Sequence, residues 1–522
     1  MRSASTRLSA ILPASCLVAL IEAEVLCLPI SLKATTPEST PSTFLERADV
    51  AAAGLVVVAL ILLAVSPSAA VTLLAMAALA LVFALRPPPG LAALASLLPF
   101  FLTSRDFGSL AFSLPELALL SALAGSTLRG VYVWRRSVRP LAFRPDTPLD
   151  GPAALFLTAA LTSLLASEVL RVSLRELRTL VLEPLAAYYL AAWFLRRERD
   201  VAVVVTGLLL GGTMAALMGL GQYFFTDHVI AVEGVRRILG PYTSPNNLGL
   251  YLGRMLPVAI ALALYLPATR AMSVPLVGIL TGALLLTFSL GAWIASLLAV
   301  LVVLGLWWQE AISVAAGYSP RGPAPNEKRR GLKPAATALA VVGLLALVAL
   351  AIPLLRLERV WSHFVAGSGT GFIRLQLWQA SINMIRDHPL LGVGMDNFFY
   401  QYRSGYILPD AIAEPNLSHP HNLVLNFWLE TGVMGVASAL WLAVALWRLG
   451  KSLWQQSLTS LARAVLAGIA GAGVDLVAHG MVDNSYFLVD LAFHFWLTAG
   501  IVVALGRQSG IASPLHPARQ MG

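Results

Sequence analysis

The chain has 522 residues, of which 58% are hydrophobic and 12% are charged, and its mean hydropathy is +0.77. Soluble domains contain about 45–50% apolar and about 25% charged residues, so this composition excludes a water-soluble globular enzyme and a disordered chain. The net charge of +9 does not indicate a nucleic acid partner, because basic residues in a membrane protein first report its topology. Two cysteines, Cys16 and Cys27, provide neither a disulfide framework nor a thiolate metal site.

Apolar runs of membrane-spanning length recur along the chain. A helix needs about 20 apolar residues to cross the ~30 Å hydrocarbon core of a bilayer. We predict an all-α, polytopic transmembrane helical bundle with twelve to fourteen spans, and 91–103 as a partial span or re-entrant hairpin. The candidate segments are 50–65, 68–85, 91–103, 110–125, 152–169, 179–195, 201–225, 248–266, 272–289, 291–309, 335–355, 432–447, 464–482 and 486–506.

The segment that precedes the first span is assigned no structure. Residues 8–32 are apolar but carry Glu22 and Glu24, so a signal-like segment, an interfacial helix and translation upstream of the true start all remain open. The predicted organisation has four parts: an N-terminal segment 1–47 of uncertain membership, a transmembrane bundle 48–355, a large extracytoplasmic loop 356–430, and C-terminal transmembrane helices with a short cytoplasmic tail 431–522.

Basic residues predict which loops face the cytoplasm. If the first span runs outward, alternate loops hold most of the arginines and lysines, including the linker 318–334, and the C-terminus is cytoplasmic. Some arginines fall on the opposite side against this bias. Arg236 and Arg237 lie in the outer loop 226–247, where a bidentate phosphate or pyrophosphate contact would explain them. For a second outer set, at 171, 175 and 178, lipid head groups are the favoured partner.

The outer loop 356–430 is too long for a simple connection, and such loops are usually functional or disordered. Residues 372–387 have helical periodicity and predict an interfacial helix with Leu375, Trp378, Ile382 and Ile385 along one side. His419 and His421 follow, directly before an apolar run. An imidazole with a pKa near ~6.5 can take a proton from a hydroxyl, but helix capping or water binding explains a lone His-x-His equally well.

Ionisable residues recur inside the last two predicted spans. Asp475, His479 and Asp483 are four residues apart and would share one helical face. Charged groups inside a bilayer are costly and usually face a bundle interior. We interpret His479 and Asp483 as supporting polar residues, and a structural polar seam between helices is the alternative.

These residues together resemble the bacterial O-antigen ligase and O-antigen polymerase superfamily. No single motif is specific, but the set occurs in the right order and on the same predicted side of the membrane. The motifs are Arg237 with Gly240 and Pro245-Asn246, Arg374 with Trp378, His388-Pro389-Leu390 with Gly392-Val393-Gly394, and His419-Pro420-His421-Asn422 with Glu430 and Gly432.

The resemblance implies a membrane-embedded, GT-C-like glycosyltransferase of the cytoplasmic (inner) membrane. Such enzymes move a glycan from an undecaprenyl-pyrophosphate carrier to an acceptor hydroxyl, on a lipid or another glycan, at the outer face of the membrane. The resemblance implies no metal and no other cofactor. Ligase and polymerase remain open, and the alternative function is a transporter or flippase of lipid-linked saccharides, which the long outer loop disfavours.

The resemblance also implies roles for individual residues in the extracytoplasmic catalytic loop and near it. His421 would be the general base, with His419 as the runner-up. Asn422 would orient His421 or cap the following helix. Arg237 and Arg374 would clamp the pyrophosphate, with Arg236 as an adjacent alternative.

One motif departs from the family. Many members have Ser-Arg-Gly at the outer start of a mid-chain helix, where this chain has Ser289-Leu290-Gly291. Arg254 or the cluster at 171, 175 and 178 could replace the missing arginine. The missing arginine bears on how the lipid carrier would be bound, and less on which class of enzyme the resemblance implies.

Overall fold

The computed structural model describes residues 41–136, 146–232, 235–315, 370–412, 414–456 and 458–511. Within these ranges eight helices are long and apolar enough to cross a membrane, and three shorter apolar helices accompany them. The prediction of an all-α polytopic membrane protein is therefore confirmed. The linker 318–334, the span 335–355 and most of the N-terminal segment lie outside the described residues.

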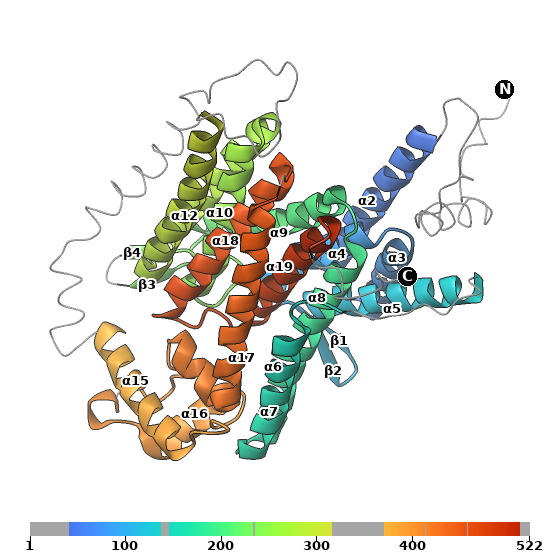
Figure 1. Ribbon diagram of the computed structural model, residues 1–522. Helices are drawn as coiled ribbons and strands as arrows, with labels where there is room; N and C mark the ends of the chain where they lie inside the picture. The colour runs from blue at the N-terminus through green and yellow to red at the C-terminus, as the bar shows by residue number, and fades with distance from the viewer. Residues whose placement is uncertain are drawn as a thin grey trace, which may run out of the picture.

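The first half of the described chain contains mostly helices and two short hairpins (Figure 1). The helices are α2 (Pro41–Val65), α3 (Ala69–Leu85), α4 (Pro87–Leu97), α5 (Leu114–Arg136), α6 (Asp150–Ser163), α7 (Leu170–Glu176), α8 (Glu183–Phe194) and α9 (Glu198–Phe225). The antiparallel hairpins are β1 (Ser104–Phe107) with β2 (Leu110–Ser113), and β3 (Ile230–Val232) with β4 (Val235–Arg237). Short turns of helix are η1 (Leu98–Phe100), η2 (Leu164–Ala166) and η3 (Leu177–Leu182).

The second half carries the central spans and the long loop. Its helices are α10 (Pro245–Tyr265), α11 (Arg270–Leu286), α12 (Leu290–Ala315), α15 (Thr370–Asp387), α16 (Phe398–Gln401), α17 (Leu423–Trp454), α18 (Ser460–Gly480) and α19 (Val489–Gln508). Short helical turns are η4 (Pro267–Thr269), η5 (Tyr402–Tyr406) and η6 (Pro409–Ala411). The segment 91–103 forms only α4 and η1, in line with its shortness.

The core of the bundle is built around α10, which packs against α18, α12, α11 and α9. Figure 1 shows α10, α12 and α18 side by side. Small residues allow this close packing, because a Cβ at Gly468 of α18 would lie 2.7 Å from the Cα of Val258. On the other side of the bundle α17 packs against α6, and α19 against α8.

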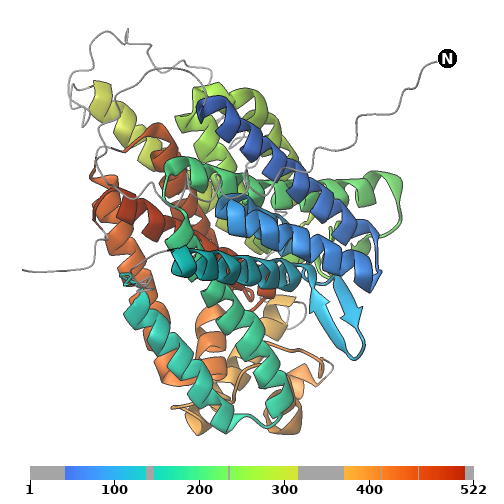
Figure 2. The same cartoon turned by 90° about the vertical axis from the view of Figure 1, so that its right-hand side faces the viewer.

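The described part of the long loop forms a module at one end of the bundle, and Figure 2 shows it at the same end in the turned view. Its helix α15 covers the segment that was predicted to form an interfacial helix. The residues that α15 buries against the protein differ from the apolar side that was predicted. Leu377, Ala380 and Met384 are buried, whereas Leu375 and Ile382 are exposed. The apolar stripe predicted from periodicity therefore faces away from the protein core over part of its length.

The module is attached to α17 at a break in that helix. Gly432 has φ 67° and ψ −169°, and this conformation interrupts the helical hydrogen bonds after Thr431. The freed backbone groups pair with the turn that follows α15: Val393 N–H donates to the Leu429 carbonyl over 2.8 Å, and Val433 N–H to the Leu390 carbonyl over 3.2 Å. This docking fixes α15 and the loop 414–422 relative to the spans.

Candidate active site

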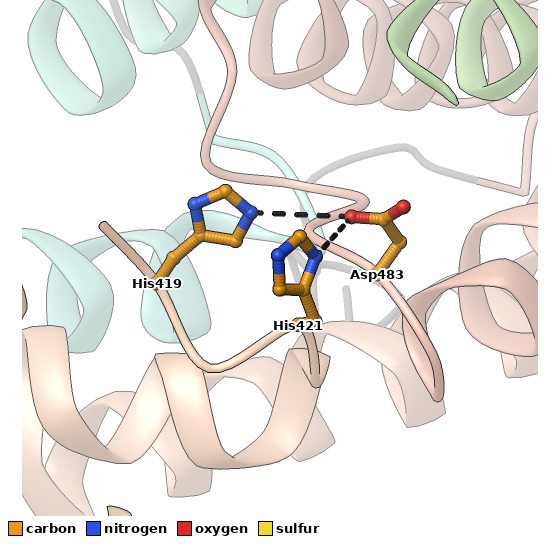
Figure 3. Close-up of side chains that lie close together, drawn as sticks. All are labelled: His419, His421 and Asp483. Carbon is orange, nitrogen blue, oxygen red and sulfur yellow. Dashed lines mark hydrogen bonds and ion pairs between the residues drawn. The ribbon is translucent and has the colours of Figure 1, made fainter. Parts of the chain in front are cut away.

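The site is centred on a histidine and an aspartate that come from different parts of the chain. Nδ1 of His421 lies 2.8 Å from Oδ1 of Asp483. Figure 3 shows the two side chains turned toward each other, with His419 beside them. Because an ionised carboxylate only accepts hydrogen bonds, the proton of the neutral imidazole is on Nδ1 and the lone pair is on Nε2. His421 has φ 52°, an uncommon left-handed conformation for a residue with a side chain. Such backbone strain is concentrated at functional sites.

Asp483 does not lie on a helical face, which corrects the prediction. The helix α18 ends at Gly480, so Asp483 is in the turn between α18 and α19, and its four-residue spacing from His479 does not continue the helix. Its side chain is only 5% exposed and is surrounded by donors. Oδ1 accepts from His421 and from the Asn484 N–H, and Oδ2 accepts from the Asn246 amide over 3.2 Å.

Two arginines predicted to bind pyrophosphate lie near this carboxylate, Arg374 in direct contact with it and Arg237 through Asn246. Arg374 is the fifth residue of α15, and its Nη2 lies 3.5 Å from Oδ2 of Asp483. Arg237 is at the end of β4, where its Nε donates to the Thr287 carbonyl and its Nη2 to Oδ1 of Asn246, both over 2.8 Å. The site therefore combines residues from β4, α10, α15, the loop before α17 and the turn after α18.

Arg236 points elsewhere. Consecutive side chains of a strand lie on opposite faces, so Arg236 and Arg237 cannot share a ligand from one face. Arg236 donates to the Thr226 carbonyl over 2.8 Å and lies over the ring of Tyr223. The structure thus separates these two neighbours and brings only Arg237 to Asp483.

His419 lies beside His421 at the edge of the site. The two ring centroids are 4.2 Å apart, and Nε2 of His419 is 3.9 Å from Oδ1 of Asp483. That distance exceeds a hydrogen bond, so His421 is the imidazole that Asp483 orients. Nδ1 of His419 interacts with the hydroxyl of Ser418 over 3.0 Å.

The charges of these groups follow from their surroundings. Burial alone would raise the pKa of Asp483, but the imidazoles of His419, His421 and His479 outweigh it and hold the pKa well below its usual range. Burial lowers the pKa of His421 from its ordinary value of 6.5, His419 and Arg374 lower it further, and Asp483 opposes them. At neutral pH the site therefore holds a carboxylate and a neutral imidazole, which is the protonation state of a general base.

Asn422 makes the contacts of a helix cap. Its Oδ1 accepts from the N–H groups of Val424 and Leu425 at the start of α17, each over 3.1 Å. Its Nδ2 donates to the Met481 carbonyl over 3.2 Å. Asn422 thus joins the backbone beside His421 to the turn that carries Asp483, and the hydrogen bond that orients the imidazole comes from Asp483.

His479 is buried in α18 and lies against α12, where a Cβ on Gly291 would be 3.1 Å from its Cδ2. The glycine of the Ser289-Leu290-Gly291 sequence therefore makes room for this imidazole. A side chain at position 291 would displace His479. His479 is also near enough to Asp483 to lower the pKa of that carboxyl.

Three of the arginines that could replace the missing family arginine, Arg254, Arg175 and Arg178, have other partners. Arg254 is fully buried in α10 and donates to the carbonyls of Leu491 and Ser485, so it joins the turn that follows Asp483 to the first turn of α19. Arg175 pairs with Asp396 over 2.9 Å, and Arg178 pairs with Glu116 and Glu183. These contacts within the protein explain the three arginines without a bound ligand.

The side chains of His419, His421 and Asp483 could also hold a metal ion, since their ligand atoms lie within 4.8 Å of one another. Two imidazoles and a carboxylate are a suitable donor set for zinc. However, Arg374 contacts the same carboxylate and Arg237 is linked to it through Asn246. Two positive charges in this position disfavour a divalent cation.

The sequence assigned no role to Asn246 or Thr287. Both fix the guanidinium of Arg237 by direct hydrogen bonds. The signal for Asn246 was its place in the Pro245-Asn246 motif, but the motif does not show which groups an amide will join. Thr287 acts through its main-chain carbonyl, so its side chain carried no signal.

Part of the chain that carries this site matches a known protein family. Residues 275–442 match the family model described as O-antigen ligase. The match contains Arg374, His419 and His421, and over this region it confirms the resemblance to the O-antigen ligase and polymerase superfamily. Arg237 and Asp483 lie outside the matched residues and are joined to it by the fold. No curated protein matches the chain.

Proposed function

We propose that this protein is a glycosyltransferase of the inner membrane that moves a glycan from an undecaprenyl-pyrophosphate carrier to an acceptor hydroxyl at the outer face. The observation that carries the proposal is the contact of His421 with Asp483, with Arg374 beside the same carboxylate and Arg237 one amide away. A base and two guanidinium groups in one site are what transfer from a diphosphate donor requires.

In the proposed reaction, Nε2 of His421 takes the proton of the acceptor hydroxyl. The acceptor oxygen forms a bond to the anomeric carbon of the donor glycan, and the bond from that carbon to the diphosphate oxygen breaks with its electron pair. Asp483 accepts the Nδ1–H bond throughout and stabilises the imidazolium that forms. The products are the glycosylated acceptor, the lipid diphosphate and a proton on His421.

The arginines are proposed to stabilise the leaving diphosphate, which gains negative charge as the bond breaks. Two guanidinium groups and one carboxylate leave an excess of one positive charge in the site. Arg237 is held by neutral acceptors, the Thr287 carbonyl and the Asn246 amide, so its charge remains available to an anion. Planar guanidinium groups bind phosphate oxygens in pairs, which suits a diphosphate.

This chemistry needs no metal or other cofactor, because the arginines supply the positive charge and the histidine supplies the base. The proposed partners are the lipid-linked donor, a lipid or glycan acceptor and the surrounding membrane lipids. The acceptor decides between a ligase and a polymerase. A transporter or flippase of lipid-linked saccharides is the alternative, but the placement of His421 in a long loop module at one end of the bundle, and not within the spans, disfavours it.

The test is glycan transfer by the purified protein in liposomes, with an undecaprenyl-pyrophosphate-linked glycan and a candidate acceptor. We expect release of the lipid diphosphate and glycosylation of the acceptor. Movement of the donor between leaflets with no new glycosidic bond would instead support the transporter. In the host, deletion of the gene should cause lipid-linked polymer to accumulate if the protein is a ligase, and should shorten surface glycans if it is a polymerase.

The proposed side of the membrane has its own test. With Cys16 and Cys27 replaced by serine, a membrane-impermeant maleimide should label Ser404→Cys, in the loop module, in intact cells. Gln455→Cys, at the far end of α17, is predicted to be cytoplasmic and should react only after the membrane is opened. Labelling in the opposite order would place the site on the cytoplasmic side and contradict the proposal.

A further inference from the structure

We propose that Asn246 is a positioning residue that couples the diphosphate-binding arginine to the catalytic base. The inference rests on the proposed function and assigns to this side chain a task in the same site. One amide joins Arg237 to Asp483: its Oδ1 accepts from Nη2 of Arg237 over 2.8 Å, and its Nδ2 donates to Oδ2 of Asp483 over 3.2 Å.

The orientation of this amide follows from its partners. A guanidinium group only donates hydrogen bonds and a carboxylate only accepts them, so the oxygen must face Arg237 and the nitrogen must face Asp483. The main chain is fixed as well. Asn246 lies in the first turn of α10, where its N–H donates to the capping hydroxyl of Ser244 over 3.2 Å and Pro245 sets the helical conformation of the first residue.

Asparagine at this position can hydrogen-bond to both Arg237 and Asp483 without adding a charge. An aspartate would neutralise Arg237 and repel Asp483, and an alanine would leave both groups without the bond. The amide is neutral, so it holds Arg237 in place and leaves its positive charge for an anion. The amide also donates a hydrogen bond to Oδ2 of Asp483. This bond fixes the carboxylate so that Oδ1 faces Nδ1 of His421.

The consequence is a physical link between donor binding and proton transfer. Any change in charge at Asn246 should act on both partners at once, on the affinity of Arg237 for diphosphate and on the protonation of His421 through Asp483. A residue that merely starts α10 would influence neither property. This distinction makes the inference testable apart from protein stability.

The experiment uses Asn246→Asp, which nearly preserves the shape of the side chain. An added carboxylate favours the protonated imidazole and so raises the pKa of His421. Because only the neutral imidazole acts as a base, the acidic limb of the pH profile of kcat/KM should move to higher pH by about one unit. The donor KM should rise roughly tenfold, because Arg237 is then neutralised.

Binding of inorganic pyrophosphate gives a second measurement that does not require turnover. Calorimetry on the full-length protein in detergent should show roughly tenfold weaker binding for Asn246→Asp than for wild type. Asn247→Asp is the matched control, since it adds the same charge to the next residue of α10. It should keep the wild-type pH limb, donor KM and pyrophosphate affinity.

Equal behaviour of Asn246→Asp and Asn247→Asp in the pH limb and in pyrophosphate affinity would overturn the inference. Restoration of the wild-type pH limb by Asn246→Gln, which again offers a neutral amide, would support it further. If the wild-type protein transfers no glycan from a diphosphate donor, the proposed function fails by itself. The pyrophosphate measurement still decides whether Asn246 governs Arg237.

Discussion

His421 and Asp483 are 62 positions apart in the chain, and their side chains meet over 2.8 Å between Nδ1 and Oδ1. Asp483 reaches this position because α18 ends at Gly480, and His421 because the loop before α17 turns at a residue with positive φ. The same carboxylate is shared with Arg374 and Asn246. A single aspartate therefore organises both the imidazole and the cationic side of the site.

Replacement of the base should abolish transfer and leave the protein folded. We expect His421→Ala to lower kcat by about 10²- to 10⁴-fold, the usual contribution of general base catalysis. His421 lies in the loop before α17, outside the packed helices of the bundle, so expression and membrane insertion should be unchanged. The measurement is glycan transfer in liposomes. His228→Ala, at an exposed histidine of the loop after α9, is the control, and activity of His421→Ala near that of this control would refute the assignment.

Loss of the carboxylate should change the pH dependence in a defined direction. Asp483 raises the pKa of His421 while burial, His419 and Arg374 lower it, so Asp483→Asn should lower that pKa further. Activity requires the neutral imidazole and therefore falls as the pH drops through the pKa. The acidic limb of the kcat/KM profile should move to lower pH, and kcat should fall at every pH because the orienting charge is lost. An unmoved limb would show that Asp483 does not act through His421.

The planar fork of Arg374 should matter beyond its charge. Arg374→Lys keeps the positive charge but cannot contact two phosphate oxygens at once, so the donor KM should rise by about tenfold. Arg386→Lys, at the exposed end of the same helix, is the matched control. The comparison of donor KM values in reconstituted protein decides the matter. If both variants use the donor like wild type, Arg374 is only an anchor for lipid head groups.

The break in α17 should be essential for attaching the loop module. Gly432 has φ 67°, and a Cβ there would lie 2.0 Å from the Leu390 carbonyl oxygen, so Gly432→Ala must displace the turn that docks on the helix. Strain of this kind costs about 1–3 kcal/mol, before the lost contacts are counted. We expect a lower unfolding temperature in detergent and loss of transfer. Gly450→Ala lies on the same helix with open space around it and should change neither.

The sequence analysis proposed Arg237, Arg374 and His421 as site residues, and the structure brings these three side chains close together. Arg237 stands in a loop that we predict to face outward, where the positive-inside rule disfavours arginine and a ligand is the natural explanation, whereas Arg374 was proposed from the family resemblance. His421 directly precedes an apolar run. An arginine against the predicted charge bias and an imidazole directly before an apolar run leave a local signal, and the structure places these groups around one carboxylate.

The partners of these residues could not be predicted in the same way. Asp483 continued a four-residue spacing, and nothing in that spacing shows that α18 ends three residues earlier. Arg236 and Arg237 could be assigned to different faces only once their segment was known to form a strand, in which consecutive side chains alternate. The amide of Asn246 acts between two groups that are far apart in sequence, and such contacts exist only in the folded protein.

Removal of divalent metal ions should leave transfer intact, although the site offers ligands for one. The atoms of His419, His421 and Asp483 lie within 4.8 Å of one another and could coordinate zinc. Arg374 contacts the same carboxylate, and a divalent cation would also compete with Nδ1 of His421 for Oδ1. We therefore expect full activity after dialysis against a chelator, and inhibition by added zinc that His419→Ala weakens. Loss of activity on chelation, with recovery on adding a divalent ion back, would show that these side chains hold a catalytic metal.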